Sequence, residues 1–284
     1  MRKVLLATTA IAAMGVTAAN ADISISGNYE WEYTQTDTGT TWGDDGHINI
    51  TAVNAADNGM TFTAKSVITN NSGANASNTE ANYISVAGDF GTIILGDYDD
   101  SAATAMDGAL GANNDIETQG GTGGASTVTG IGGAADITWM SPSMSGFKVG
   151  VSKDLTDDDT DLDDGKTDMA VTYSVGGASV YYGNSDDSTS VGVKGSVAGF
   201  TIAVGNKSTS GSTAKANDVA VKYTLGNGIT IAALSASGTT AAGVKVKASN
   251  IGASYAIVPG VKLNAESGKL DDANYTWVAV NMSF

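Results

Sequence analysis

Apolar and polar residues alternate with a period of two along most of the chain. In the segment 22–33, one phase is apolar and aromatic and the other is polar or acidic. The apolar phase holds Ile23, Ile25, Tyr29, Trp31 and Tyr33, and the polar phase holds Ser24, Ser26, Asn28, Glu30 and Glu32. Successive side chains of a strand point to opposite faces, so this pattern predicts a strand with one apolar and one polar face.

The same alternation recurs in fifteen further segments with turn residues between them. We predict sixteen strands, at 22–33, 46–53, 60–68, 81–87, 92–98, 136–141, 147–153, 168–175, 179–184, 189–196, 200–206, 217–225, 229–236, 249–257, 261–268 and 274–284. The fourteenth is the least regular, because 244–248 reads either as loop or as an extension of the strand.

The connections alternate between short turns and segments that are often longer and more polar. The predicted short turns lie at 55–59, 88–91, 142–146, 176–178, 197–199, 226–228 and 258–260. The other connections lie at 34–45, 69–80, 99–135, 154–167, 185–188, 207–216, 237–243 and 269–273. Short turns at one end, longer loops at the other and an even strand count are typical of an all-β, sixteen-stranded antiparallel transmembrane barrel.

A soluble β-sandwich or a repeat solenoid is the alternative fold. A sandwich seldom needs sixteen consecutive hairpin-linked strands, and a calcium-binding β-roll would repeat a GGxGxD nonapeptide. The sequence GGTGG at 120–124 does not continue into such a repeat. A barrel also accounts for the modest apolar content, since closure removes edge strands and lipid covers the apolar face.

The connection 99–135 is rich in Gly, Ala, Asp and Thr and follows a tight hairpin at 83–98. It is too long for an ordinary hairpin connection, and loops of this size are functional or disordered. We expect this third long loop to fold back into the barrel and narrow it. Its acids would then form a negative patch at the pore constriction, where screening water is scarce, although ordinary solvated surface acids are the alternative. These acids are Asp97, Asp99, Asp100, Asp107, Asp115 and Glu117.

Five lysines fall on the polar phases of their strands, which predicts a basic wall inside the barrel. A lysine that faces lipid at the bilayer midplane costs about 2–4 kcal/mol, so inward placement is expected for barrel lysines. We expect Lys65 to lie opposite the acidic loop, because its strand comes early in the barrel. The five are Lys65, Lys148, Lys194, Lys222 and Lys262.

The first 21 residues read as a cleaved signal peptide for Sec-type export. A basic start precedes an apolar stretch, and Ala19-Asn20-Ala21 forms an A-x-A cleavage site, so we expect cleavage between Ala21 and Asp22. A retained N-terminal anchor is the alternative. Residues 22–284 then form a single β-barrel domain.

Removal of 1–21 takes away one Arg and one Lys and leaves 12 basic and 30 acidic residues, a net charge of −18. Such acidity argues against a nucleic-acid partner, whose phosphates need Lys and Arg. There is no cysteine, so no disulfide stabilises the exported chain. The ratio of 37 Gly to 2 Pro fits long antiparallel ladders, from which proline is excluded.

The segment 154–166 carries seven aspartates. Asp157, Asp159, Asp161 and Asp163 are candidates for a weak structural Ca²⁺ site, but the EF-hand pattern is not met and a solvated acidic loop is the favoured interpretation. His47 is the only histidine, and we place it at the rim, where a strand leaves the first loop. It has no serine or metal-ligating partners in its strand, so we expect no catalytic residues, no cofactor and no enzyme activity.

The terminal strand NYTWVAVNMSF ends on Phe284, with Val278, Val280 and Met282 at alternate positions before it. This ending, together with DISISG at 22–27, GMTFTAK at 59–65, NYISVAGDFGTIILGDYD at 82–99 and ITWMSPSMSGFKVGVS at 137–152, resembles the general porins of Gram-negative outer membranes, especially the alphaproteobacterial type. The resemblance spans nearly the whole chain.

The resemblance implies a sixteen-stranded barrel, usually a homotrimer, in the cell outer membrane. It implies contacts with outer-membrane lipid and lipopolysaccharide, and recognition of Phe284 as an assembly signal by the barrel assembly machinery. Two features depart from the family. The long loop lacks PEFGG-type text, and Tyr275 and Trp277 fall on the inward phase of the last strand, which points to a bulge or a girdle position there.

The resulting hypothesis is a water-filled channel for passive diffusion of small hydrophilic solutes and ions, weakly cation-selective. By resemblance, lumenal lysines opposite the acidic loop would set up a transverse field. Two alternatives remain. A substrate-selective porin would need a row of lumenal aromatics, and a closed structural or adhesive barrel would need bulky or charge-paired side chains in its lumen; the inward phases are mainly Ser, Thr, Asn, Gly and Lys.

Overall fold

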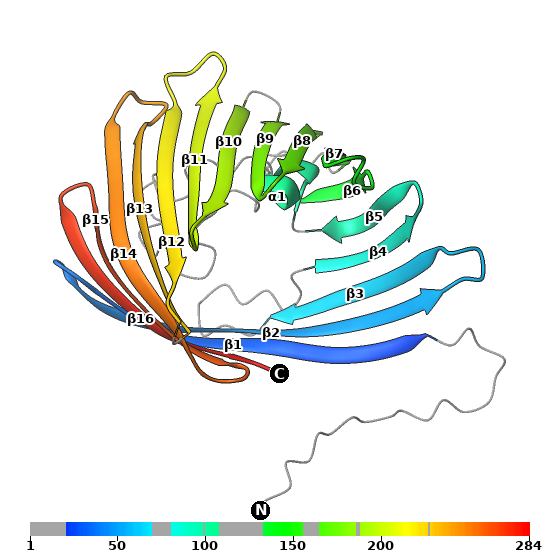
Figure 1. Ribbon diagram of the computed structural model, residues 1–284, viewed down its shortest axis with the longest axis horizontal. Coiled ribbons are helices and arrows are strands. Elements are labelled where there is room, and N and C mark those ends of the chain that lie inside the picture. The colour runs from blue at the N-terminus through cyan, green and yellow to red at the C-terminus, as the bar shows by residue number, and fades with distance from the viewer. Residues whose placement is uncertain are drawn as a thin grey trace, which may run out of the picture.

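A computed structural model describes residues 21–69, 81–98, 100–107, 133–155, 165–185, 188–226 and 228–284. Sixteen strands form one closed barrel in which every strand pairs antiparallel with its neighbours in sequence, and β1 pairs with β16 to close the ring (Figure 1). The predicted fold class is therefore confirmed. The described chain contains no helix that is long and apolar enough to cross a membrane.

The strands differ in length around the ring, and a single short helix follows β5. The elements are β1 (Asp22–Thr36), β2 (Gly39–Ala55), β3 (Thr61–Thr69), β4 (Ala81–Gly88), β5 (Gly91–Tyr98), α1 (Ala102–Asp107), β6 (Ala135–Met140), β7 (Phe147–Lys153), β8 (Thr167–Val175), β9 (Ala178–Ser185), β10 (Ser188–Val197), β11 (Phe200–Thr209), β12 (Lys215–Thr224), β13 (Ile229–Thr239), β14 (Lys245–Val258), β15 (Val261–Leu270) and β16 (Ala273–Ser283).

The apolar phase of the strands faces outward and the small polar phase faces inward. Ile23, Ile84 and Ile251 are more than half exposed on the outer surface. Side chains of the other phase, such as Thr138 and Ser190, are fully buried inside the ring. This arrangement is the reverse of a soluble core and is what a lipid-facing barrel requires.

One end of the barrel carries the chain's first and last strand residues together with the tight turns 89–90, 176–177, 198–199 and 259–260. The opposite end carries the long connections 70–80, 99–134 and 154–166. We call these the turn end and the loop end. The predicted alternation of short and long connections holds for these turns and loops.

The strands at the loop end are longer than the sequence predicts. The expected first loop 34–45 is mostly strand, because β1 runs to Thr36 and β2 starts at Gly39. The expected loop 207–216 shrinks to 210–214. The uncertain stretch 244–248 belongs almost entirely to β14, which starts at Lys245. In these parts the regular alternation is incomplete: Trp42 is the one apolar residue of 39–45, and Val246 packs inward against Ala216 and Ala236. The backbone ladder therefore continues where the regular alternation has ended.

Candidate functional site

The start of the long third loop turns into the barrel and docks on its inner wall. Helix α1 packs against the inward faces of β7, β8 and β9, where Met106 forms a buried cluster with Ala170 and Tyr181 (Figure 1). The backbone N–H of Ala102 donates to the Ser152 hydroxyl at 2.9 Å, and the Tyr181 hydroxyl donates to the Ala103 carbonyl at 3.0 Å. A six-residue helix is not stable by itself, so these wall contacts hold it in place.

Gly150 allows the helix to come this close. A Cβ atom at this position would lie 2.9 Å from the Ala102 Cβ and 2.8 Å from the Met106 Sδ. Both distances are shorter than the contacts that Cβ atoms make with other heavy atoms. Glycine is used where a backbone must be approached closely. The wall is therefore shaped to receive α1 at this level.

The predicted acidic constriction residues lie in several different environments. Asp100 is half-buried beside α1; burial raises the pKa of its carboxyl, and the positive charge of Lys65 opposes that rise. Asp97 lies two residues after the outward Leu95 on β5 and pairs with Asn82. Its side chain is therefore on the outer face of the barrel and not in the lumen, where we expected it. Asp107 ends α1, and Asp99, Asp115 and Glu117 lie outside the described residues.

All five predicted lysines lie on the inward phases of their strands, but they occupy two levels. Lys148, Lys194, Lys222 and Lys262 are each within three residues of the strand terminus at the turn end. Lys148 and Lys194 line a cavity of about 540 Å³ beneath α1, which Ala105 and Met106 also border. These lysines therefore form a basic rim below the helix rather than a wall along the whole barrel.

Lys65 stands apart from that rim, at the middle of β3. Its ammonium group lies 6.0 Å from the centre of the Tyr83 ring, and Tyr83 packs edge-on against Tyr98 at 5.1 Å. Tyr98 ends β5 directly before the long loop. Lys65 is thus the lysine whose charge reaches the described start of the loop, at Asp100.

Sequence reasoning missed a set of inward carboxylates on the opposite wall. Trp277 Nε1 donates to Glu32 at 2.9 Å, and Asn250 Nδ2 donates to Glu266 at 3.0 Å. The Tyr275 hydroxyl also donates to Glu266, and Asn281 donates to Glu30. These neutral donors orient the carboxylates.

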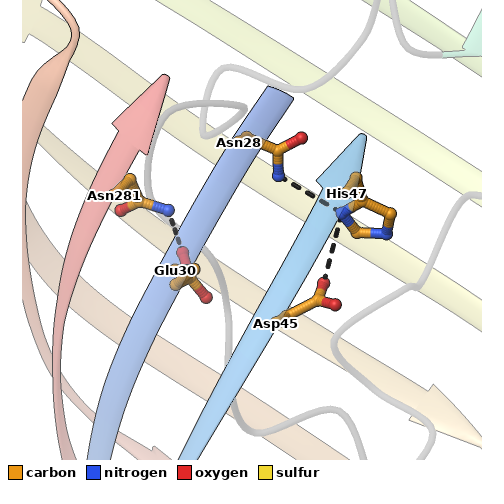
Figure 2. A network of polar contacts seen from close by, with 5 residues as sticks. All are labelled: Asn28, Glu30, Asp45, His47 and Asn281. Atoms are coloured by element: carbon orange, nitrogen blue, oxygen red, sulfur yellow. Dashed lines mark hydrogen bonds and ion pairs between the residues drawn. The ribbon is translucent and has the colours of Figure 1, made fainter. Parts of the chain in front are cut away.

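Figure 2 shows how this wall continues across β1 and β2. Asn28 Nδ2 lies 3.3 Å from His47 Nδ1, which is 3.7 Å from an Asp45 carboxylate oxygen. His47 was expected at a rim, but it pairs with Asn28 well inside the long β1–β2 ladder. The difference follows from the unexpected length of β2. We call Glu30, Glu32, Asp45 and Glu266 the acidic wall.

Barrel closure sets this acidic wall against the strands that carry the basic rim and α1. In a closed ring of sixteen strands, strands eight places apart lie across the lumen from one another, so β1 faces β9, β2 faces β10 and β15 faces β7. The signal in the sequence that could have revealed Glu30 and Glu32 is the alternation, which places both on the polar face of the first strand. Their position across the ring from β9, one of the strands that hold α1, follows only from the strand order.

Tyr275 and Trp277 point inward, as their phase predicts, and the ladders that join β16 to β1 and to β15 run without a register shift. A bulge occurs instead in β14, between Ala256 and Val258. With Ala279, the two aromatic residues form a buried cluster, and Trp277 is 0% exposed. Neither a bulge nor a girdle position is therefore needed to explain them.

The candidate calcium ligands Asp157, Asp159, Asp161 and Asp163 lie outside the described residues. Over the ranges of the chain that the structure does describe, no group of three or more His, Cys, Asp or Glu residues is arranged to hold a metal ion.

The geometry defines a hollow transmembrane barrel with an inward helix and charged, opposed walls, which is the architecture of a membrane channel. Comparison with known proteins identifies the family: a model described as Gram-negative porin matches residues 7–275, and the chain belongs to this family. It is a general porin channel of the Gram-negative outer membrane and not an enzyme. Members of the family are typically trimeric.

Solved structures of a bacterial porin share the fold. A double mutant of Rhodopseudomonas blastica porin is 20% identical with a TM-score of 0.74, and a triple mutant of the same protein is 19% identical with a TM-score of 0.75. Each comparison covers 93% of this chain and 100% of the other. No curated protein matches the sequence.

The docking of α1 leads to a first prediction. Replacing Ser152 by Ala and Tyr181 by Phe removes one partner from each hydrogen bond to the helix backbone, which costs about 1–3 kcal/mol for each buried group left unpaired. We expect single-channel recordings of the double variant to show more open-channel noise than the wild type, because the loop start is less firmly held. Tyr182→Phe, on the outward face of the same strand, is the matched control. Equal noise in both variants would show that these bonds do not hold the loop.

Proposed function

We propose that this porin forms a water-filled channel for passive diffusion of small hydrophilic solutes and ions, with a weak preference for cations. The observation that carries the proposal is the acidic wall, in which Glu30, Glu32 and Asp45 are partly exposed on the inner faces of β1 and β2 and Glu266 is buried on β15. These strands lie across the ring from the strands that hold α1. A row of carboxylates beside a narrow aqueous path raises the local concentration of cations. The size limit comes from the third loop, whose described start narrows the barrel from the β7–β9 side.

The basic rim works against this preference, and its position limits how far. Lys148, Lys194, Lys222 and Lys262 lie at the turn end, whereas Glu30 and Glu32 lie near the middle of β1. The two sets of charge therefore act at different points along the path. The net charge of −18 expected for the mature chain favours cations, and the lysines of the basic rim reduce that preference. The cation selectivity that we propose is therefore weak.

A substrate-selective porin is less well supported. Such a channel presents aromatic faces to the passing solute, but Trp277 and Tyr181 are no more than 1% exposed. These rings fill space against the wall and against α1.

The remaining parts of the proposal concern biogenesis and assembly. The mature chain starts at Asp22, the first residue of β1, after cleavage behind Ala21 and Sec-type export. The protein is a homotrimer in contact with outer-membrane lipid and lipopolysaccharide, and the barrel assembly machinery reads Phe284.

Planar-bilayer recording across a salt gradient tests the channel proposal. We expect stepwise conductance and a zero-current potential of the sign that indicates cation preference. An anion-selective potential would show that the basic rim dominates the path. Absence of conductance from folded, heat-modifiable protein would contradict the open channel.

A further inference from the structure

The cavity beneath α1, at the turn end of the barrel, combines charged, polar and apolar groups. Lys148 and Lys194 line it from β7 and β10, and the hydroxyl groups of Thr172, Ser174 and Ser179 belong to the wall between them. Its volume of about 540 Å³ is within the range of sites that hold small organic molecules. We call it the α1 cavity.

The strand register brings these side chains together. Lys148 pairs with Thr172, so the two share one row of the inner face. Ser174, Ser179 and Lys194 pair in turn and form the next row toward the turns. Adjacent strands lie about 4.8 Å apart, so the backbones of the two lysines are separated by roughly 15 Å. The cavity therefore has a positive charge at each side and hydroxyl groups between them.

No described acid neutralises these two lysines. Among the described residues, no carboxylate lies within 4.0 Å of either ammonium group, and none of the residues that line the cavity is acidic. Lys222, one row nearer to the turns, lies close enough to Lys194 for the two positive charges to repel each other. Positive charges that are held together in a partly enclosed space attract an anion.

The side of the cavity nearest to the helix is apolar. Ala105 and Met106 of α1 border it together with Met140 of β6. Met106 is fixed there by its packing against Ala170 and Tyr181. Methionine side chains are polarizable and fill irregular spaces, so they adapt to apolar ligands of different shape. A ligand that fills this cavity therefore has an apolar body beside its negative charge.

From this arrangement we infer that the α1 cavity binds a small organic carboxylate with an apolar body. A carboxylate accepts several hydrogen bonds at once, and the ammonium and hydroxyl groups of the cavity supply the donors. The apolar body lies against Ala105, Met106 and Met140. The acidic wall acts on all anions alike, whereas this site distinguishes anions by their apolar part. The ligand reaches the cavity through the water-filled lumen, and in this respect the inference rests on the proposed function.

Binding of para-fluorobenzoate to the purified, refolded protein in detergent micelles tests the inference, with the fluorine NMR signal of the ligand as the readout. The titrations are made in dilute salt, because salt screens charges. The proteins are the wild type, a cavity variant with Lys148 and Lys194 changed to Gln, and a control variant with Lys65 and Lys262 changed to Gln. Both variants lose two positive charges from the inner face of the barrel, but neither Lys65 nor Lys262 borders the cavity. The neutral analogue is para-fluorobenzamide.

We expect the cavity variant to bind para-fluorobenzoate at least about tenfold more weakly than the wild type, because it loses two charge-assisted hydrogen bonds. The control variant should bind it as the wild type does. The neutral amide should bind weakly and equally to all three proteins, and equimolar acetate, which lacks the apolar body, should leave para-fluorobenzoate bound. A variant with Lys148 and Lys194 changed to Arg should retain binding, which excludes misfolding as the cause of the loss.

Three results would overturn the inference: equal affinity of the cavity and control variants for para-fluorobenzoate, binding of the neutral amide as tightly as the carboxylate, or displacement of para-fluorobenzoate by equimolar acetate. The last would show that the cavity holds any small anion. Single-channel conductance of the same proteins is measured in parallel, because the two proposals fail separately. Conductance without binding would overturn the cavity site alone, and binding without conductance would overturn the proposed channel alone.

Discussion

Changing Glu30, Glu32 and Glu266 to Gln will remove the cation preference of the channel and move the zero-current potential to the anion-selective side. All three carboxylates face the lumen from β1 and β15, and each accepts a hydrogen bond from a neutral side chain. Glutamine keeps the size of the side chain and an oxygen that accepts the same bond. The change therefore removes three negative charges with little effect on packing.

The size of the effect follows from the distance between these charges and a passing ion. A unit charge about 6 Å from an ion in water contributes about 0.7 kcal/mol, which is about threefold in local cation concentration, and ions screen it over about 8–10 Å. Three such changes leave the lysines of the basic rim as the main fixed charges beside the path. We expect the permeability ratio of cation to anion to fall about tenfold or more in dilute salt and by much less in concentrated salt.

A single substitution on the outer surface provides the control. Asp44 lies on the outward phase of β2, where it pairs with Trp31 and accepts a hydrogen bond from the Tyr29 hydroxyl at 2.5 Å. Asp44→Asn and Glu32→Gln remove one charge each from opposite faces of neighbouring strands. If both shifted the zero-current potential equally, selectivity would depend on total charge and not on the lumenal wall.

The sequence predicted the barrel well because the membrane imposes one rule on every strand. Each spanning segment must present an apolar face to lipid, and the alternation that results marks all sixteen strands in order. Beyond the hydrocarbon layer the rule no longer applies. Residues 39–45 of β2 are glycine, threonine and aspartate apart from Trp42, and a single apolar residue makes no alternation, so the sequence predicts a loop there.

The site was predicted less completely, for two separate reasons. Asp97 is predicted among the constriction acids in or beside the loop, although it lies at the end of the predicted strand 92–98 and continues the outward phase of Ile93 and Leu95. The alternation alone places it on the outer face. The acidic wall is different. Glu266 lies far from Glu30 and Glu32 in sequence, and they share one side of the barrel only because β1 and β16 close the ring.

Helix α1 could not be predicted from its own residues. AATAMD lies within a glycine-rich loop, and six residues show no helical periodicity. The helix exists because Gly150 and Ala170 leave room on the wall and because Ser152 and Tyr181 bond its backbone. A helix stabilised by tertiary contacts of this kind leaves little trace in local sequence.

Changing Gly27 to Val will impair closure of the barrel at the seam between β1 and β16. Gly27 pairs with the last residue: its N–H donates to the Phe284 carbonyl at 2.9 Å and its carbonyl accepts from the Phe284 N–H at 3.0 Å. The Phe284 ring lies over the glycine, so a Cβ atom here would lie 2.5 Å from the ring and 2.8 Å from the His47 carbonyl oxygen. The ring can rotate away, but the His47 backbone cannot move without disturbing the β1–β2 ladder.

Overpacking of this kind costs about 1–3 kcal/mol in well-packed proteins, and a backbone clash adds to that figure. We expect Gly27→Val to lower the urea midpoint of the refolded barrel clearly and to reduce the heat-modifiable fraction on gels. Gly195→Val is the matched control: Gly195 is also an outward strand residue, but the nearest atom to its Cβ position is 4.0 Å away. Equal midpoints for the two variants would show that the Phe284 ring and Gly27 do not depend on each other.

Deletion of Phe284 separates this structural role from the proposed role as an assembly signal. The deletion removes both backbone hydrogen bonds to Gly27 and the ring that covers it. If Phe284 stabilises the closed barrel, the deleted protein refolded in vitro will unfold at lower urea, as the Gly27→Val variant does. If it acts only as a signal, the refolded protein will be as stable as the wild type while its amount in the outer membrane falls. We expect both losses, because the residue that ends the chain also completes the β1–β16 seam.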